Sequence, residues 1–290
     1  MIVALVGGRG QVGTDLGPLL EAAGHQVRVF GRDELPVQHR ERVLAVMAQM
    51  QPDAIVNCSV FHPVDRCESE AAECFAVNAL GPWHLALAAK QLGARLIHFS
   101  SDYVFDGEAE RPYLESDVPS PHSVFGVAKV AGEQLIRVTW DRHAILRTSG
   151  LYGIAGSRVK GGNFVETMLR LGRERGRAEV VHDLRMAQTA TRNLACQTLT
   201  LLEAGASGTF HASDHGSCSW FEFAQMIFEE AGMKVEVTPV PASAFPAAAP
   251  RPKYSVLASE RLGAMGLDRM QPIRVALREY LCARERAHGR

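Results

Sequence analysis

The composition of this 290-residue chain is that of an ordinary globular protein, with 47% hydrophobic and 22% charged residues. Its formal net charge of −1 predicts neither nucleic acid nor an anionic membrane as a partner, because both attract a strongly basic surface. The six cysteines form no C-x-x-C pair and lack zinc-site spacing, so we expect reduced thiols and no metal. No apolar run could span a membrane and no signal peptide is apparent, which favours a cytoplasmic protein.

Short apolar runs alternate with amphipathic segments through the first half of the chain. The runs are rich in Val, Ile, Leu and Phe, as strands buried on both faces should be, and lie at 2–6, 26–30, 54–57, 95–99 and 144–147. The segments between them predict helices at about 11–23, 39–50, 66–92 and 125–139. This alternation is typical of an α/β fold with a doubly wound parallel sheet, the Rossmann arrangement, in which ligands bind at the carboxyl ends of the strands.

The pattern loosens after Arg147, which predicts a cofactor-binding domain over 1–148 and a smaller, less regular substrate-binding region over 149–290. Residues 149–162 are rich in glycine and serine and predict a loop. Residues 239–252 hold five prolines and predict an irregular segment. Helices are expected near 163–175, 190–204, 220–231 and 272–286, and strands near 179–182 and 208–212. One of these strands could return to the main sheet.

A glycine-rich loop follows the first predicted strand and opens the first predicted helix. Its glycines at 7, 10 and 13 allow a tight turn, close approach of backbone to a pyrophosphate, and close packing of the helix on the sheet. The free N–H groups at the start of the helix would bind phosphate. The loop therefore predicts a dinucleotide cofactor, with candidate contacts at Gly7, Arg9, Gly10, Gln11, Val12 and Gly13.

The end of the second predicted strand bears on the choice of cofactor. An acidic residue there usually holds the ribose 2′-hydroxyl of NAD, whereas arginine suits the 2′-phosphate of NADP. Gly31 falls at about the position of that acid and Arg32 follows it. The sequence thus favours NADP(H), with Arg9 as a second phosphate contact. Asp33 keeps NAD(H) open, and a solvated surface charge is the alternative interpretation of Arg32.

Polar residues also stand at the ends of the later strands. Ser100 and Ser101 end the fourth strand, while Phe125 and Lys129 are four apart on a predicted helix and so share one face. With the glycine loop, these motifs resemble the extended short-chain dehydrogenases/reductases. The run from Ser101 to Phe105 and the helix residues Gly126 and Lys129–Glu133 narrow the resemblance to the dTDP-4-dehydrorhamnose reductases.

This resemblance implies an NADP(H)-dependent enzyme that moves hydride to C4 of a nucleotide-linked 4-keto-6-deoxysugar, and it implies a homodimer. Ser101 would polarise the carbonyl, a tyrosine at position 125 would donate the proton, and Lys129 would bond the nicotinamide ribose. Further cofactor contacts would be Cys58, Ser59, Asn78 and Ser100. The chain is also similar to the regulatory beta subunit of methionine adenosyltransferase, so the alternative is an NADP-binding regulatory or scaffold subunit without turnover.

Position 125 departs from the resemblance, because Phe125 stands where the acid is expected. A positioned general acid contributes about 10²–10⁴-fold, so its loss should cripple hydride transfer without abolishing it. His122, Ser101, Tyr103 or a bound water could supply the proton instead. For His122, an exposed loop histidine is the simpler interpretation.

Two further departures accompany Phe125. Gly150 stands where the reductases usually carry a tryptophan, and the segment 184–188 differs from their usual sequence. A single Tyr-to-Phe change could be engineered to trap a complex, whereas three changes lining one pocket indicate divergence of substrate or role. A third hypothesis is different chemistry with bound NADP, for which Gly150 would leave room.

Overall fold

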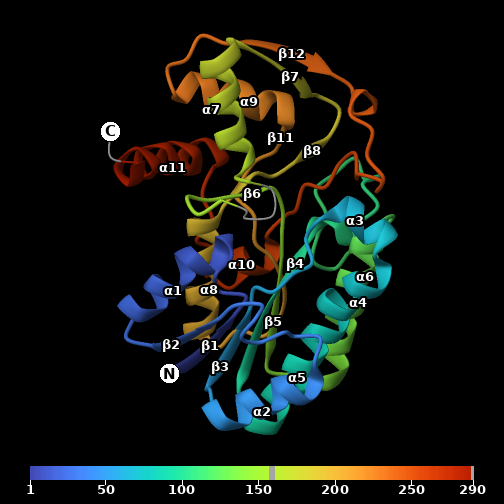
Figure 1. Cartoon of the computed structure of the whole chain (residues 1–290), viewed down its shortest axis with the longest axis vertical. Helices are drawn as coiled ribbons and strands as arrows, with labels where there is room; N and C mark the ends of the chain where they lie inside the picture. Colours follow the sequence, from blue (N-terminus) through green and yellow to red (C-terminus); the bar gives the residue numbers. More distant parts are fainter. Residues whose placement is uncertain (157–160, 289–290) are drawn as a thin grey trace.

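A parallel sheet with helices on both faces forms the centre of the computed structural model, which describes residues 1–156 and 161–288 (Figure 1). Six strands run in the order β10-β5-β4-β3-β1-β2, and every neighbouring pair is parallel. They are β1 (Ile2–Val6), β2 (Gln26–Phe30), β3 (Ala54–Asn57), β4 (Arg95–Ser101), β5 (His143–Thr148) and β10 (Gly208–His211). The five strands predicted in the first half are confirmed, and β10 brings a strand from the second half to the sheet edge.

Strand residues alternate between the two faces of the sheet, and each face is covered by its own helices. On one face Val3 and Leu5 pack with α1 (Gln11–Ala22) and α8 (Thr191–Ala204). On the other face Ala4 and Val6 pack with α2 (Arg40–Met50), α5 (Gly81–Leu92) and α6 (Val124–Thr139) (Figure 1). Burial on both faces explains why the strands read as continuous apolar runs.

The helix predicted over 66–92 is wrong as a single element. The chain forms α3 (Val64–Ser69), α4 (Ala71–Phe75), a π-helical turn η1 (Ala76–Leu80) and α5. Pro82 has no N–H for the carbonyl of Asn78, four residues earlier, which removes one helical hydrogen bond at this point. A Cβ on Gly132 of α6 would lie 2.4 Å from that carbonyl oxygen, so α6 packs closely against the interruption.

The second half of the chain adds a smaller region above the carboxyl ends of the main strands (Figure 1). Its core is formed by α7 (Phe164–Arg175), α9 (Trp220–Glu230) and α11 (Ile273–His288), which confirms the helices predicted there. Two short helices, η3 (Ala242–Ala244) and α10 (Glu260–Ala264), also belong to the second half, and a third, η2 (Asp102–Val104), follows β4 in the first half. Residues 157–160 of the predicted loop lie outside the described residues.

Three two-stranded pairs complete this region. They are β7 (Arg177–Val181) with β12 (Glu236–Val240), β8 (Arg185–Met186) with β11 (Cys218–Ser219), and β6 (Leu151–Tyr152) with β9 (Thr189–Ala190). The segment 239–252 is therefore less irregular than predicted, because β12 continues through Pro239 to Val240 as an edge strand. Within the described residues no helix is both long and apolar enough to cross a membrane.

Candidate active site

The glycine loop lies at the carboxyl end of β1, where the sheet order reverses between β2 and β3. Gly7 has a φ of +69°, and the N–H of Gly10 donates to its carbonyl oxygen at 3.0 Å. A Cβ on Gly7 would lie 2.6 Å from the backbone nitrogen of Ser59, and one on Gly13 would lie 2.3 Å from Cα of Gly8. Glycine is therefore required for the turn and for the close approach of α1, as the motif predicts.

The residues at this edge fit a dinucleotide. The backbone N–H groups of Gln11, Val12 and Gly13 open α1 and have no carbonyl four residues earlier within the helix, which leaves them free for phosphate. Several buried side-chain atoms of the described residues have no hydrogen-bond partner, and four of them are Gln11 Oε1, Thr148 Oγ1, Gln188 Nε2 and Thr189 Oγ1. Buried polar atoms normally have a partner, so a bound molecule could supply it here.

An acidic residue that sequence reasoning missed pairs with one of the two predicted phosphate-binding arginines. Glu34 accepts hydrogen bonds from the backbone N–H of Gly31 and from Arg9, both at 2.6 Å. Arg9 is thus paired, whereas Arg32 is exposed and has no ion pair within the described part of the chain. The signal for Glu34 was an acid four residues beyond the end of β2.

A buried polar chain joins β3, β4 and α6. Ser59 donates to Asn57 Oδ1, Asn57 Nδ2 lies 3.0 Å from His98 Nδ1, and Lys129 Nζ lies 3.3 Å from His98 Nε2. A neutral His98 has only one acceptor nitrogen, so it can accept a hydrogen bond from Asn57 or from Lys129 but not from both. Lys129 also donates to the carbonyl of Phe99 at 2.5 Å, and burial lowers the pKa of Lys129 to about 8. Sequence reasoning named Ser59 and Lys129 but missed the polar residues between them.

Two other predicted cofactor contacts lie close to this chain. Burial raises the pKa of the Cys58 thiol to about 12, so it stays protonated. Asn78 is fully buried, and its amide bonds the backbone N–H and carbonyl of Phe61 and donates to Cys74 Sγ. Both N–H groups of Asn78 therefore have acceptors already, which makes it a residue that shapes the segment after β3.

Phe125 lies in the first turn of α6, which Ser123 caps by accepting from the N–H of Gly126 at 3.1 Å. The Phe125 ring is 5% exposed and meets Tyr103 edge to face, with ring centroids 5.9 Å apart. A Cβ on Gly126 would lie only 2.2 Å from the carbonyl oxygen of Tyr103, which fixes how closely α6 approaches η2. The position of the expected acid is thus a packed aromatic contact without a hydroxyl.

The two serines that end β4 face different groups. Ser100 faces Glu133, which pairs with the buried guanidinium of Arg147. Burial raises the pKa of Glu133, but Arg147, Ser100 and Arg137 together hold it below its usual value. Ser101 donates to Asp102 Oδ1 at 2.9 Å. Asp102 Oδ2 accepts from Ser255, 153 positions further along the chain, at 2.6 Å. Burial raises the pKa of Asp102 to about 6.

Ser255 and Tyr103 also line a pocket of about 170 Å³ between the two regions of the chain. Its walls are mostly apolar, and the other lining residues are Val64, Leu184, Met186, Trp220, Arg251 and Pro252. The segment 184–188, whose sequence differs from that of the reductases, therefore does line the pocket. The expectation that Gly150 leaves room is wrong, because a Cβ there would lie 2.6 Å from both the carbonyl oxygen of Ala187 and the side-chain oxygen of Gln188.

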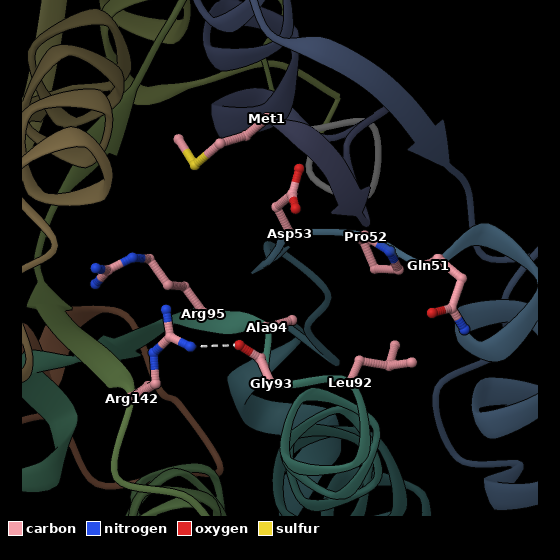
Figure 2. A pocket seen from close by; sticks show the side chains of 9 residues that line it. All are labelled: Met1, Gln51, Pro52, Asp53, Leu92, Gly93, Ala94, Arg95 and Arg142. Carbon is pink, nitrogen blue, oxygen red and sulfur yellow. Dashed lines mark hydrogen bonds between the residues drawn. The ribbon is translucent and has the colours of Figure 1, made fainter.

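A larger pocket of about 600 Å³ lies at the opposite edge of the sheet (Figure 2). It is lined by residues at the amino ends of the strands, including Met1, Asp53 and Arg95, and by Arg142, which donates to the carbonyl of Gly93 at 2.6 Å. No residue of the glycine loop or of the β4 end reaches it. Across the described residues, no three His, Cys, Asp or Glu side chains gather as metal ligands.

Comparison with known proteins agrees with this geometry. A profile of the RmlD substrate binding domain family matches residues 1–285. The dTDP-4-dehydrorhamnose reductase of Streptomyces griseus is 37% identical over 290 residues, covering 97% of this chain and 94% of the relative. The spore coat polysaccharide biosynthesis protein SpsK of Bacillus subtilis is 37% identical over 285 residues, with 98% of both chains covered.

A solved structure shows the same likeness in three dimensions. The dTDP-4-dehydrorhamnose reductase of Bacillus anthracis in complex with NADP superposes with a TM-score of 0.93 and 36% identity, covering 98% of this chain and 100% of that chain. Both the fold and the sequence thus agree over nearly the whole length. The chain belongs to the RmlD substrate binding domain family, within the extended short-chain dehydrogenases/reductases.

Proposed function

We propose that the protein is an NADP(H)-dependent reductase of a nucleotide-linked 4-keto-6-deoxysugar. The observation that carries the proposal is the joint position of the glycine loop, Ser101 and Lys129 at the carboxyl edge of one parallel sheet, beside a pocket between the two halves of the chain. Relatives that match more than nine-tenths of the chain are named dTDP-4-dehydrorhamnose reductase and dTDP-4-keto-6-deoxy-D-glucose reductase. Residues 1–148 would hold the cofactor, and residues 149–290 would hold most of the sugar nucleotide.

Each group has a definite task in this proposal. Bound NADPH would supply a hydride to the sugar carbonyl carbon. The N–H groups at the start of α1 would hold the pyrophosphate, and Arg32 would hold the 2′-phosphate. Lys129 would orient the nicotinamide ribose, and Ser101 would hydrogen-bond the carbonyl oxygen. Leu184, Met186 and Trp220 would exclude water from the sugar.

Oxidation of NADPH in the presence of dTDP-4-keto-6-deoxysugars, followed by absorbance at 340 nm, tests the proposal. The matched variant is Phe125→Tyr, which adds one hydroxyl where the acid is expected. If the parent has no other acid, the restored hydroxyl should raise its turnover by about 10²–10⁴-fold. If Phe125→Tyr binds NADPH and still turns over none of these sugars, the proposed function fails.

Phe125 also favours a second candidate, a cofactor-binding regulatory or scaffold subunit. That function predicts NADPH affinity without turnover and a stable complex with a protein partner. Turnover by the parent chain would exclude it as the sole function. The homodimer and the cytoplasmic location expected from the sequence remain predictions, which light scattering and cell fractionation would test.

A further inference from the structure

Phe125 leaves the expected position of the proton donor without a hydroxyl. Ser101, Asp102 and Ser255 form a hydrogen-bonded chain of hydroxyl, carboxyl and hydroxyl groups. We propose that Asp102 is the proton source of the reductase, acting through Ser101, so that no hydroxyl is needed at position 125. This inference rests on the proposed function and adds the origin of the proton. Asp102 is a positioning residue here, because it acts through Ser101 and does not itself meet the substrate.

The geometry allows a proton to pass along this chain. Ser101 is half-buried at the end of β4, and its Oγ lies 2.9 Å from Asp102 Oδ1. A neutral Asp102 carboxyl can donate across this contact, which frees the Ser101 hydroxyl proton to point toward a bound carbonyl oxygen. Ser101 Oγ also accepts from the N–H of Tyr103 at 3.2 Å, which fixes the serine while the proton moves.

The step balances without any further reactant. The carbonyl carbon would gain a hydride from the reduced nicotinamide, the C=O π pair would move onto oxygen, and that oxygen would take the proton of Ser101. Ser101 Oγ then takes the proton of Asp102, which becomes a carboxylate. A solvent proton restores the carboxyl between turnovers.

Other proton sources near Phe125 fit less well. Asp102 is 3% exposed, and burial brings its pKa to about 6, close to the value that general acid catalysis at neutral pH requires. Burial instead raises the pKa of Tyr103 well above its usual value, which makes that phenol a weaker acid. His122 is exposed on the surface.

Burial raises the pKa of Asp102, whereas hydrogen bonds from Ser255, from Ser101 and from the backbone N–H groups of Asp102 and Tyr103 lower it. Among the described residues no charged side chain is hydrogen-bonded to Asp102. Ionisable groups on the elements packed around it include Tyr103 on η2, three on α6 (Lys129, Glu133 and Arg137), Arg251, Lys253 and Tyr254 just before Ser255, and Arg185 of β8, which is bridged to Tyr254.

The test is a double-variant cycle of Asp102→Asn and Phe125→Tyr. In the parent, Asp102→Asn should lower kcat by about 10²–10⁴-fold, while in Phe125→Tyr the loss should shrink below about threefold, because the tyrosine then gives the proton. Circular dichroism and NADPH affinity, followed by fluorescence, check that each variant is folded. An equal loss in both backgrounds would show a merely structural role and overturn the proposal.

The pH profile gives an independent readout. A general acid must be protonated, so turnover of the parent should be highest below about pH 6 and fall tenfold per pH unit above it. Ser255→Ala removes a hydrogen bond that favours the carboxylate, and it should therefore move this limb upward by about one pH unit. A limb that stays in place in Ser255→Ala contradicts the assignment to Asp102.

A titration separates this inference from the proposed function. If no variant turns over any sugar, the proposed function fails, and carbon-13 NMR of the Asp102 carboxyl in the protein with NADP⁺ still decides the inference. A midpoint near pH 6 would support a neutral acid at this position, whereas a midpoint below about pH 4.5 would overturn it.

Discussion

Glu133→Gln should destabilise the protein by several kcal/mol, because it leaves a buried arginine without its counter-charge. Glu133 is fully buried and Arg147 is 2% exposed. The guanidinium of Arg147 donates to both carboxylate oxygens, at 2.9 and 2.8 Å, and Arg137 adds a third hydrogen bond at 2.8 Å. Breaking a buried pair by removing one partner typically costs about 3–5 kcal/mol, and the bidentate geometry places this pair in that range.

The assay is urea unfolding followed by tryptophan fluorescence, with the slope m checked to be unchanged. Glu174→Gln is the matched control, because its pair with Arg170 is 52% and 58% exposed and should contribute less than about 0.5 kcal/mol. The contribution of Glu133 should be complete above pH 4.5 and disappear as pH falls through its lowered folded-state pKa. A loss below about 1 kcal/mol at pH 7 would refute the reasoning.

Three further predictions concern packing, cofactor choice and pH. Gly126→Ala should lower the free energy of unfolding by about 1–3 kcal/mol, because its Cβ would lie 2.2 Å from the Tyr103 carbonyl oxygen. Gly263→Ala is the control: its Cβ would have no atom within 4 Å, so it should not destabilise the protein in the same urea assay. Arg32→Ala should weaken NADPH about tenfold and leave NADH unchanged in fluorescence titrations; equal losses would contradict a 2′-phosphate contact. Burial, with the charge of Arg147, lowers the pKa of His211 to about 4. The contribution of neutral His211 to the free energy of unfolding should therefore be complete above pH 6.5 and should fall by about 3 kcal/mol between pH 6.5 and pH 4. The same decrease in pH should cost His211→Gln much less.

Local sequence patterns determined the sheet and the glycine loop. The apolar runs from Ile2 onward predict their strands because a strand buried on both faces can hold few other residue types. The glycine positions follow from contacts a few residues away in the chain or across one strand pair, such as Gly13 against Gly8. Pro82 in the sequence is a signal for the interruption of the helix, but the long amphipathic pattern from 66 to 92 favoured one continuous helix.

Only the tertiary structure decided which polar groups act together in the site. The hydrogen bond between Asp102 and Ser255 joins residues 153 positions apart, and no spacing rule connects them. The absence of a side chain at Gly150 predicts open space beside it, yet the carbonyl of Ala187 and the side chain of Gln188 occupy that space. The sequence determined that the hydroxyl is absent at Phe125. Whether a buried carboxyl lies close enough to replace it depends on desolvation and on contacts between distant segments, which exist only once the chain has folded.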